Sequence, residues 1–184
     1  MTPCYLAGKG MHATQATWDF KTALIELLEA SQLGYDTRFR YYRNEFPDMP
    51  CTELARLICD PIESYDREWP GYWSHKKGEG HDKEEVLTEY MLLLDNRFRR
   101  EAELALVCFD EGGLGTGINV MRFVQMNKPI LGFYNPVIKK HGVNVNNILQ
   151  LKLEYPTLVT LHQYHDWSDI QGSVVAYLRN FKKP

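Results

Sequence analysis

The chain of 184 residues has no long apolar run, and this absence excludes a conventional membrane span. No stretch approaches the roughly 18 consecutive apolar residues that a transmembrane helix needs. The chain also begins with a strand-like segment at residues 3–7, without a basic start or an apolar stretch, so we expect no signal peptide. These absences predict a cytoplasmic protein without membrane partners.

Cysteine is scarce, and Cys4, Cys51, Cys59 and Cys108 show no C-x-x-C spacing. Cys4 and Cys108 fall within predicted core strands, where a free thiol behaves as a small hydrophobic group. No histidine pattern beside them indicates thiol catalysis, and the six histidines form no set with metal-ligand spacing. We therefore expect reduced thiols, no metal and no other cofactor.

The chain also has no excess of basic over acidic residues. The net charge is −3 and the isoelectric point is near 6.1, which argues against general nucleic-acid binding. The composition, with 44% hydrophobic and 24% charged residues, is typical of a globular protein. The length suffices for one domain with its own core, and no internal repeat is present. We expect residues 1–184 to form a single domain.

Short apolar segments alternate with amphipathic ones along the chain. Strands are predicted at residues 3–7, 35–42, 104–109, 129–133 and 158–162. Helices are predicted from Thr14 or Thr17 to a cap at Gly34, and at residues 52–62, 84–100, 119–126, 143–153 and 166–181. This alternation implies parallel strands joined by right-handed crossovers. The predicted fold is a three-layer α/β/α domain with a doubly wound, five-stranded parallel sheet of the flavodoxin or Rossmann type.

Residues 64–83 fit neither pattern. The segment is rich in aromatic, glycine and charged residues and has no clear periodicity. Loops of this length in compact domains are often functional or disordered, but the aromatic residues argue against disorder. We interpret the segment as an insertion that acts as a lid, faces a partner, or simply covers part of the core.

The most informative stretch, residues 105–136, predicts a buried strand, a glycine-rich turn, a helix and a second buried strand. Ligands in open α/β sheets bind where the carboxyl ends of the strands meet the following helices. Asp110 and Glu111 end the first of these strands, and carboxylates there could orient sugar hydroxyls or act as acid and base. The turn contains Gly112, Gly113, Gly115, Thr116 and Gly117. Its N–H groups could bind a phosphate at the helix N-terminus.

Two further elements could contribute to a site. Gly8 and Gly10 follow the first strand and predict a turn at the same edge of the sheet, although such turns also occur without a ligand. Asp95 lies on the helix over residues 84–100, and its spacing from Arg99 favours a surface ion pair. No lysine stands at the spacing of a P-loop, and the glycine turn does not fit the dinucleotide fingerprint.

Three motifs together resemble the nucleoside 2-deoxyribosyltransferase-like superfamily. Residues 5–8, Tyr-Leu-Ala-Gly, look like its opening strand and turn. Asp95, followed eight residues later by Glu103, resembles its acidic helix residue and the acid before its third strand. Residues 113–119 and then 127–130 look like its glycine-threonine turn, the start of its catalytic helix and its Gly-Lys-Pro-Val segment. The resemblance covers the chain from residue 1 to about residue 135.

The resemblance implies a small doubly wound domain that cleaves or exchanges the N-glycosidic bond of a nucleoside or nucleotide. It implies that Tyr5 and Gly8 contact the base or sugar. It further implies that Asp95 and Asp110 orient hydroxyls or a proton, and that residues 113–116 bind a phosphate where one is present. Members of the superfamily assemble as dimers or larger homo-oligomers, so a homo-oligomer is expected here.

Asn119 departs from the superfamily, where this position holds a glutamate that attacks the anomeric carbon. A neutral amide is a poor nucleophile and does not stabilise an oxocarbenium-like centre. Glu111 or Glu101 could supply the carboxylate, or Asp95 or Asp110 could position water for direct hydrolysis. The pocket could also bind nucleotides without chemistry, or belong to an NAD-cleaving domain. We favour an N-glycosidase or deoxyribosyltransferase, because two acids and the glycine turn remain at one sheet edge.

Overall fold

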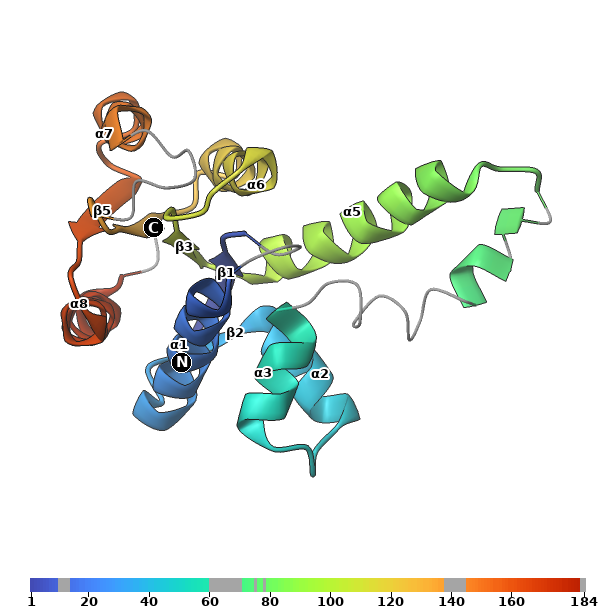
Figure 1. The fold of residues 1–184 in the computed structure, drawn as a ribbon, viewed down its shortest axis with the longest axis horizontal. Helices are drawn as coiled ribbons and strands as arrows, with labels where there is room; N and C mark the ends of the chain where they lie inside the picture. Colours follow the sequence, from blue (N-terminus) through green and yellow to red (C-terminus); the bar gives the residue numbers. More distant parts are fainter. Residues whose placement is uncertain (10–13, 60–70, 75, 78, 138–144, 183–184) are drawn as a thin grey trace.

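A single parallel sheet forms the centre of the molecule (Figure 1). The computed structural model describes residues 1–9, 14–59, 71–74, 76–77, 79–137 and 145–182. The strands are β1 (Thr2–Ala7), β2 (Gly34–Asp36), β3 (Leu104–Cys108), β4 (Ile130–Tyr134) and β5 (Val159–Gln163). They lie in the order β2-β1-β3-β4-β5, and every neighbouring pair is parallel. The order is that of flavodoxin-like doubly wound domains, so the predicted fold class is confirmed.

Helices cover both faces of the sheet. One face packs against α5 (Lys83–Glu101), α6 (Leu114–Gln125) and α7 (Val145–Glu154). The opposite face packs against α1 (Gln15–Ser31) and α8 (Trp167–Asn180). Helices α2 (Thr37–Glu45) and α3 (Cys51–Cys59) lie beside α1 and form a third apolar cluster with it. Because both faces are covered, β3 reads as a continuous apolar run and all its residues are buried.

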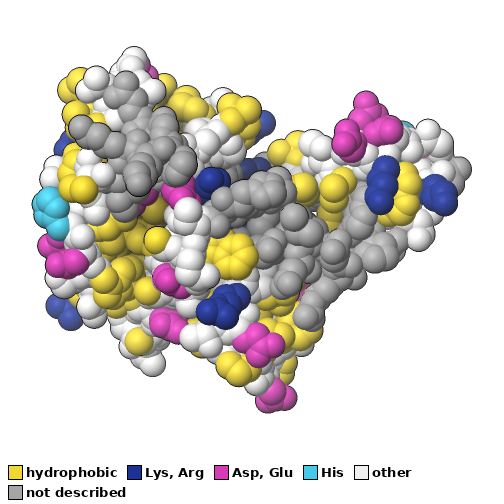
Figure 2. All heavy atoms as spheres, viewed as in Figure 1, with side chains coloured by type: hydrophobic (Ala, Val, Ile, Leu, Met, Phe, Trp, Pro, Cys, Tyr) yellow, Lys and Arg dark blue, Asp and Glu magenta, His cyan; other side chains and the backbone are white. Residues whose placement is uncertain are grey.

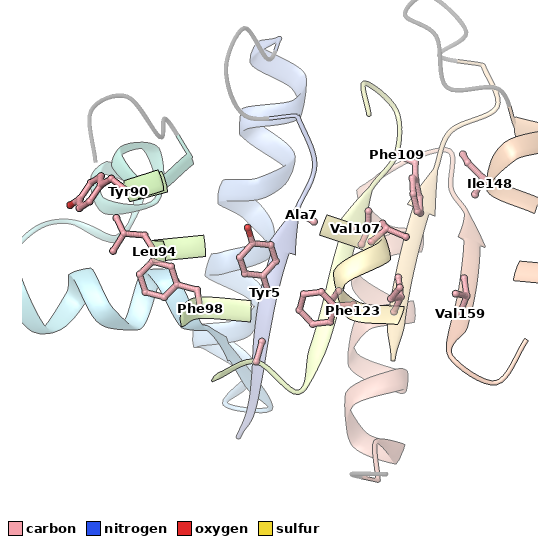
Figure 3. Packing of buried hydrophobic residues seen from close by; sticks show 14 of the residues in the cluster. Tyr5, Ala7, Tyr90, Leu94, Phe98, Val107, Phe109, Phe123, Ile148 and Val159 are labelled. Atoms are coloured by element: carbon pink, nitrogen blue, oxygen red, sulfur yellow. The ribbon is translucent and has the colours of Figure 1, made fainter. Parts of the chain in front are cut away.

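The core on the α5–α6–α7 face contains the tyrosine that leads to the candidate site. Tyr5 of β1 lies between Phe98 of α5 and Phe123 of α6 (Figure 3). All three side chains are buried, and the rings of Tyr5 and Phe123 are 5.7 Å apart. The Tyr5 hydroxyl lies near Asp95 of α5 and Asn119 of α6.

Two boundary predictions near the second strand are wrong. β2 ends at Asp36, and residues 37–42, predicted as strand, belong to α2. The Asp36 side chain accepts a hydrogen bond of 2.8 Å from the Phe39 backbone N–H and so caps the helix. Gly34 does not cap α1, because Gln32 takes the left-handed conformation there and Gly34 begins β2. At Gly34 a Cβ would lie only 2.9 Å from the Thr2 carbonyl oxygen.

The N-terminal half of α5 extends away from the sheet and, with residues 71–74 and 76–77, forms an arm (Figure 1). Tyr72 packs against Tyr90 of α5 with the ring centres 4.9 Å apart. Charged side chains of both signs gather at the end of the arm, where Lys76 pairs with Glu79 and Glu89 (Figure 2).

Most of the predicted insertion before residue 71 lies outside the described residues, as do residues 60–62 and 143–144 of two predicted helices. Among the helices described, none combines the length and the apolar character that crossing a bilayer requires.

The ring of Phe109 packs so closely against β4 that position 132 has room only for a glycine. A Cβ at Gly132 would lie 2.5 Å from Phe109 Cε2 and 2.9 Å from Leu161 Cδ2. We expect Gly132→Ala to lower the free energy of unfolding by about 1–3 kcal/mol, because the buried ring has to move. Urea denaturation measures the effect, and Gly172→Ala is the control, since a Cβ at Gly172 meets open space within helix α8. Equal stability of the two variants would contradict this packing argument.

Candidate functional site

Three predicted site residues that are far apart in the sequence meet between α5 and α6, namely Tyr5, Asp95 and Asn119. Tyr5 Oη lies 3.3 Å from Asp95 Oδ1 and 3.5 Å from Asn119 Oδ1. In this strand order the topological switch point lies between β1 and β3, and β1 carries Tyr5. The three residues therefore gather beside the switch point, where doubly wound domains bind their ligands.

Arg38 is a site residue that the sequence analysis missed. Its Nη2 donates to Asp95 Oδ1 at 3.0 Å and to Tyr5 Oη at 3.2 Å, and its Nη1 donates to the Ile58 carbonyl at 3.1 Å. Arg38 lies in the first turn of α2, within the segment that was predicted as strand. Asp36, two residues earlier, was the available signal, since an aspartate is a favoured helix N-cap.

Arg99 of α5 is the last member of this group of contacting side chains. The predicted pair with Asp95 is present, with Arg99 Nη1 and Asp95 Oδ2 3.9 Å apart. Its predicted place at the surface is wrong, because the Arg99 side chain is only 4% exposed. Nη1 donates to Asn119 Oδ1 and Nη2 donates to Asn96 Oδ1 at 2.9 Å. Arg99 Nε is buried and has no hydrogen-bond partner within the described part of the chain. The guanidinium is thus held mainly by neutral amide oxygens.

The charges in this group of side chains do not balance. We call Tyr5, Arg38, Asp95, Arg99 and Asn119 the Tyr5 cluster. It holds two guanidinium groups and one carboxylate, and the carboxylate is 23% exposed. Asp36 also interacts with Arg38, but burial raises the pKa of its carboxyl against that interaction and against its backbone hydrogen bonds. Within the Tyr5 cluster, two guanidinium groups thus share one partly exposed carboxylate.

Asp110 ends β3 as predicted but is hydrogen-bonded within the sheet edge. Its Oδ1 accepts from the Asn135 backbone N–H at 2.7 Å, and its Oδ2 accepts from the Tyr164 hydroxyl. Burial raises the pKa of the Asp110 carboxyl above its usual range, although both hydrogen bonds oppose this. These contacts join the ends of three strands, and they involve no residue of the Tyr5 cluster.

Glu111 and Glu101 also have partners outside the Tyr5 cluster. Glu111 accepts hydrogen bonds from the Thr14 backbone N–H at 3.0 Å and from Thr17 Oγ1 at 2.8 Å. Burial acts to raise the pKa of Glu111, but these hydrogen bonds outweigh it and hold the pKa below its usual range. Glu101 is half exposed and pairs with Arg97 at 3.2 Å. Glu111 therefore ties the loop after β3 to the start of α1.

The hydrogen bonds of Glu111 predict a pH-dependent contribution to stability. Because the pKa is lower in the folded state, this contribution is complete above the unfolded pKa of about 4.3 and is lost as the pH falls through the folded value. We expect Glu111→Gln to cost about 1–3 kcal/mol at neutral pH and to flatten the loss of stability upon acidification. Urea unfolding at several pH values measures this, with exposed Glu45→Gln as control. An unchanged pH profile in Glu111→Gln would contradict the assignment.

The glycine-rich turn is shorter than predicted, because α6 begins at Leu114 and not near Asn119. Gly113 is the N-cap, while Gly115 and Gly117 lie in the first turns of the helix, where an added Cβ would meet open space. Gly8 follows β1, and a Cβ there would lie 3.3 Å from the Cys108 carbonyl oxygen. Gly8 thus allows β1 and β3 to approach closely at their carboxyl ends, whereas Gly10 lies outside the described residues.

A cavity of about 290 Å³ opens between α6 and α7 at the carboxyl end of the sheet. It is lined by Phe109, Gly112, Gly113, Thr116, Gly117, Val120, Met121, Asn147, Ile148 and Leu151. Thr116 Oγ1 is buried and has no hydrogen-bond partner within the described ranges. Gly113 and Thr116, both predicted as binding residues, therefore border this cavity, whereas Gly115 does not.

A larger groove of about 700 Å³ lies against α8 and the residues that precede β4 and β5. His162 and Tyr177 line it, and it includes none of the predicted site residues. Ligands of doubly wound domains bind at the carboxyl ends of the strands, so we take the α6–α7 cavity and the Tyr5 cluster as the candidate site.

The described residues contain no group of three or more His, Cys, Asp or Glu side chains placed to hold a metal ion. Cys4, Cys51 and Cys108 are free, and burial raises the pKa of the Cys108 thiol to about 12. A thiol with so high a pKa is a poor nucleophile at neutral pH. The polar groups of the Tyr5 cluster are two guanidinium groups, the Asn119 amide, the Tyr5 hydroxyl and the Asp95 carboxylate.

No family model and no curated protein matches this chain.

Proposed function

We propose that this chain binds a nucleoside phosphate at the Tyr5 cluster and holds it without cleaving the N-glycosidic bond. The observation that carries the proposal is the pair of guanidinium groups, Arg38 and Arg99, around one carboxylate. The nucleoside part of the ligand follows from the resemblance of Tyr5, Asp95 and Asn119 to the residues of the nucleoside 2-deoxyribosyltransferase-like superfamily.

The state of Arg99 supports an anionic ligand. A buried charge is costly unless it is well paired. Arg99 has Asp95 at 3.9 Å, whereas its hydrogen bonds go to neutral amides and its buried Nε has no partner among the residues described. A phosphate beside Arg99 and Arg38 would supply the missing negative charge. Arginine suits this role because its planar fork of donors matches the oxygens of a phosphate.

The same charges argue against cleavage. Cleavage of an N-glycosidic bond passes through an oxocarbenium-like transition state, which positive surroundings disfavour. Asn119 Oδ1 is a neutral acceptor that faces Arg99 and Tyr5, so it offers no carboxylate for attack. Asp110 and Glu111, the other predicted acids, hold hydrogen bonds elsewhere.

Calorimetric titration with nucleoside monophosphates and with the matching nucleosides tests this proposal. We expect each monophosphate that binds to do so at least about tenfold more tightly than its nucleoside, a difference of about 1.4 kcal/mol. Chromatography of the same mixtures is expected to detect no free base. Equal affinity for nucleoside and monophosphate would contradict a phosphate site at the two arginines.

Direct hydrolysis is a second candidate function, favoured by the contact between Tyr5 and Asp95. Asp95 is the carboxylate of the cluster and is partly exposed, so it could position a water molecule. Release of free base by the unmodified chain, reduced at least about tenfold in Asp95→Asn, would support hydrolysis over simple binding. Release that is equal in both proteins would contradict a role for Asp95.

A further inference from the structure

The cavity between α6 and α7 lies close to the Tyr5 cluster but is not part of it. Thr116 and Val120 of α6 line the cavity, and Asn119 of the same helix belongs to the cluster. Helix residues three positions apart have Cβ atoms about 5–6 Å from each other. The two sites therefore occupy neighbouring sides of the first turns of α6.

The lining of the cavity combines apolar walls with a polar margin. The walls are formed by the side chains of Phe109, Val120, Met121, Ile148 and Leu151. The margin is formed by the backbone at Gly112 and Gly113, by Thr116 and by the Asn147 amide. The volume of about 290 Å³ is at the lower end of the range for ligand pockets, about 300–1,000 Å³. It suits one part of a ligand, such as a ring.

The residues that line the cavity suit one part of a nucleoside phosphate better than the others. A sugar phosphate would leave the apolar walls unmatched, and an alkyl chain would leave the buried Thr116 Oγ1 without a partner. A planar heteroaromatic ring has two apolar faces and a polar edge, so it satisfies both. Phe109 adds an aromatic wall, and its ring position depends on Gly132.

We infer that the α6–α7 cavity binds the heteroaromatic base of the ligand whose phosphate lies at Arg38 and Arg99. The inference rests on the proposed function for the phosphate and for the occupancy of the Tyr5 cluster. It adds that recognition of the base resides on the side of α6 that faces α7, next to the side that carries Asn119, with Asn147 at the polar edge of the ring.

Gly117 provides a direct test, because it lines the cavity and a Cβ there meets nothing within 4 Å. Gly117→Leu adds a bulky side chain at a position that lines the cavity, and it replaces a glycine inside a helix, which favours folding. Gly115→Leu is the matched control: it lies in the same helix with equal open space but does not line the cavity. Gly117→Ala adds a smaller group and gives a graded series.

Calorimetric titration with adenosine, guanosine, cytidine and uridine monophosphates and with ribose 5-phosphate measures the effect. We expect Gly117→Leu to weaken nucleotide binding at least about tenfold and to leave ribose 5-phosphate binding unchanged. Gly117→Ala is expected to have a smaller effect, and Gly115→Leu none. Nucleotide affinity that Gly117→Leu does not change would overturn the inference while leaving the phosphate site intact.

Failure of the proposed function gives a different result, namely that the unmodified chain binds neither nucleotides nor ribose 5-phosphate. The cavity is then tested with the free bases adenine, guanine, cytosine and uracil as probes. Binding of a base that is lost in Gly117→Leu and kept in Gly115→Leu would support the inference by itself. Absence of base binding in that case would overturn it.

Discussion

Arg99→Met is expected to weaken the binding of a nucleoside monophosphate by at least about 30-fold, or about 2 kcal/mol. Loss of one partner in a buried, hydrogen-bonded charge pair costs about 2–5 kcal/mol of affinity. Arg99 is the more buried of the two arginines, and its carboxylate partner, Asp95, lies at 3.9 Å and also pairs with Arg38, so a ligand phosphate would be a closer counter-charge. Calorimetric titration measures the change directly.

Arg97→Met is the matched control for this prediction. Arg97 lies two residues earlier on α5, is half exposed and pairs with Glu101 at the surface. Its removal eliminates the same charge from the same helix but leaves the Tyr5 cluster intact. A similar loss of affinity in both variants would indicate a general electrostatic effect and would contradict a specific role for Arg99.

The stability of Arg99→Met separates a binding role from a structural one. A methionine removes a buried charge and keeps much of the apolar volume, so the ligand-free variant should be about as stable as the original chain. The ligand should raise the stability of the original chain by about 2.7 kcal/mol at a hundredfold excess over the dissociation constant, and this gain should largely disappear in the variant. A ligand-free variant that unfolds would identify Arg99 as a structural residue instead.

The sheet and most helices could be predicted because their signals are local. β1, β3, β4 and β5 are short apolar runs bounded by turn residues, and α5 has a strong helical periodicity. The start of the segment Thr37–Glu45 misled the prediction, since Thr37, Phe39 and Tyr41 alternate with charged residues as in a strand. In the structure Asp36 caps a helix here, and its Phe39 and Tyr42 are buried in one apolar cluster with α1 and α3. Tertiary packing thus overrides a strand-like pattern.

The candidate site was predicted less completely than the fold, because its partners are distant in sequence. Asp95 was paired with Arg99 on helical spacing, but it accepts a shorter contact from Arg38, 57 residues earlier. Asp110 and Glu111 stand at the strand end as predicted, yet their hydrogen bonds lead to Tyr164 and Thr17. The residue types at the sheet edge were thus correctly identified, whereas their pairing depended on the position of α2 and of the loops.

Asn119→Glu tests the link between the charge of the Tyr5 cluster and its chemistry. A glutamate at this position would place a carboxylate near Arg99 and Tyr5 and would balance two guanidinium groups with two carboxylates. We therefore expect the affinity for a nucleoside monophosphate to fall at least about tenfold, because the phosphate no longer meets excess positive charge. The affinity for the uncharged nucleoside should change less.

The same substitution is expected to create base release from nucleosides, at least about tenfold above that of Asn119→Gln. A carboxylate can attack the anomeric carbon and hold the sugar as an ester until water releases it, whereas an amide cannot. Asn119→Gln is the matched control, since its side chain has the length of glutamate without the charge. Chromatography of free base measures the difference. Equal release by the two variants would contradict the assignment of Asn119 to the position of the nucleophile. An unchanged affinity of Asn119→Glu for the monophosphate would contradict the electrostatic basis of the phosphate site.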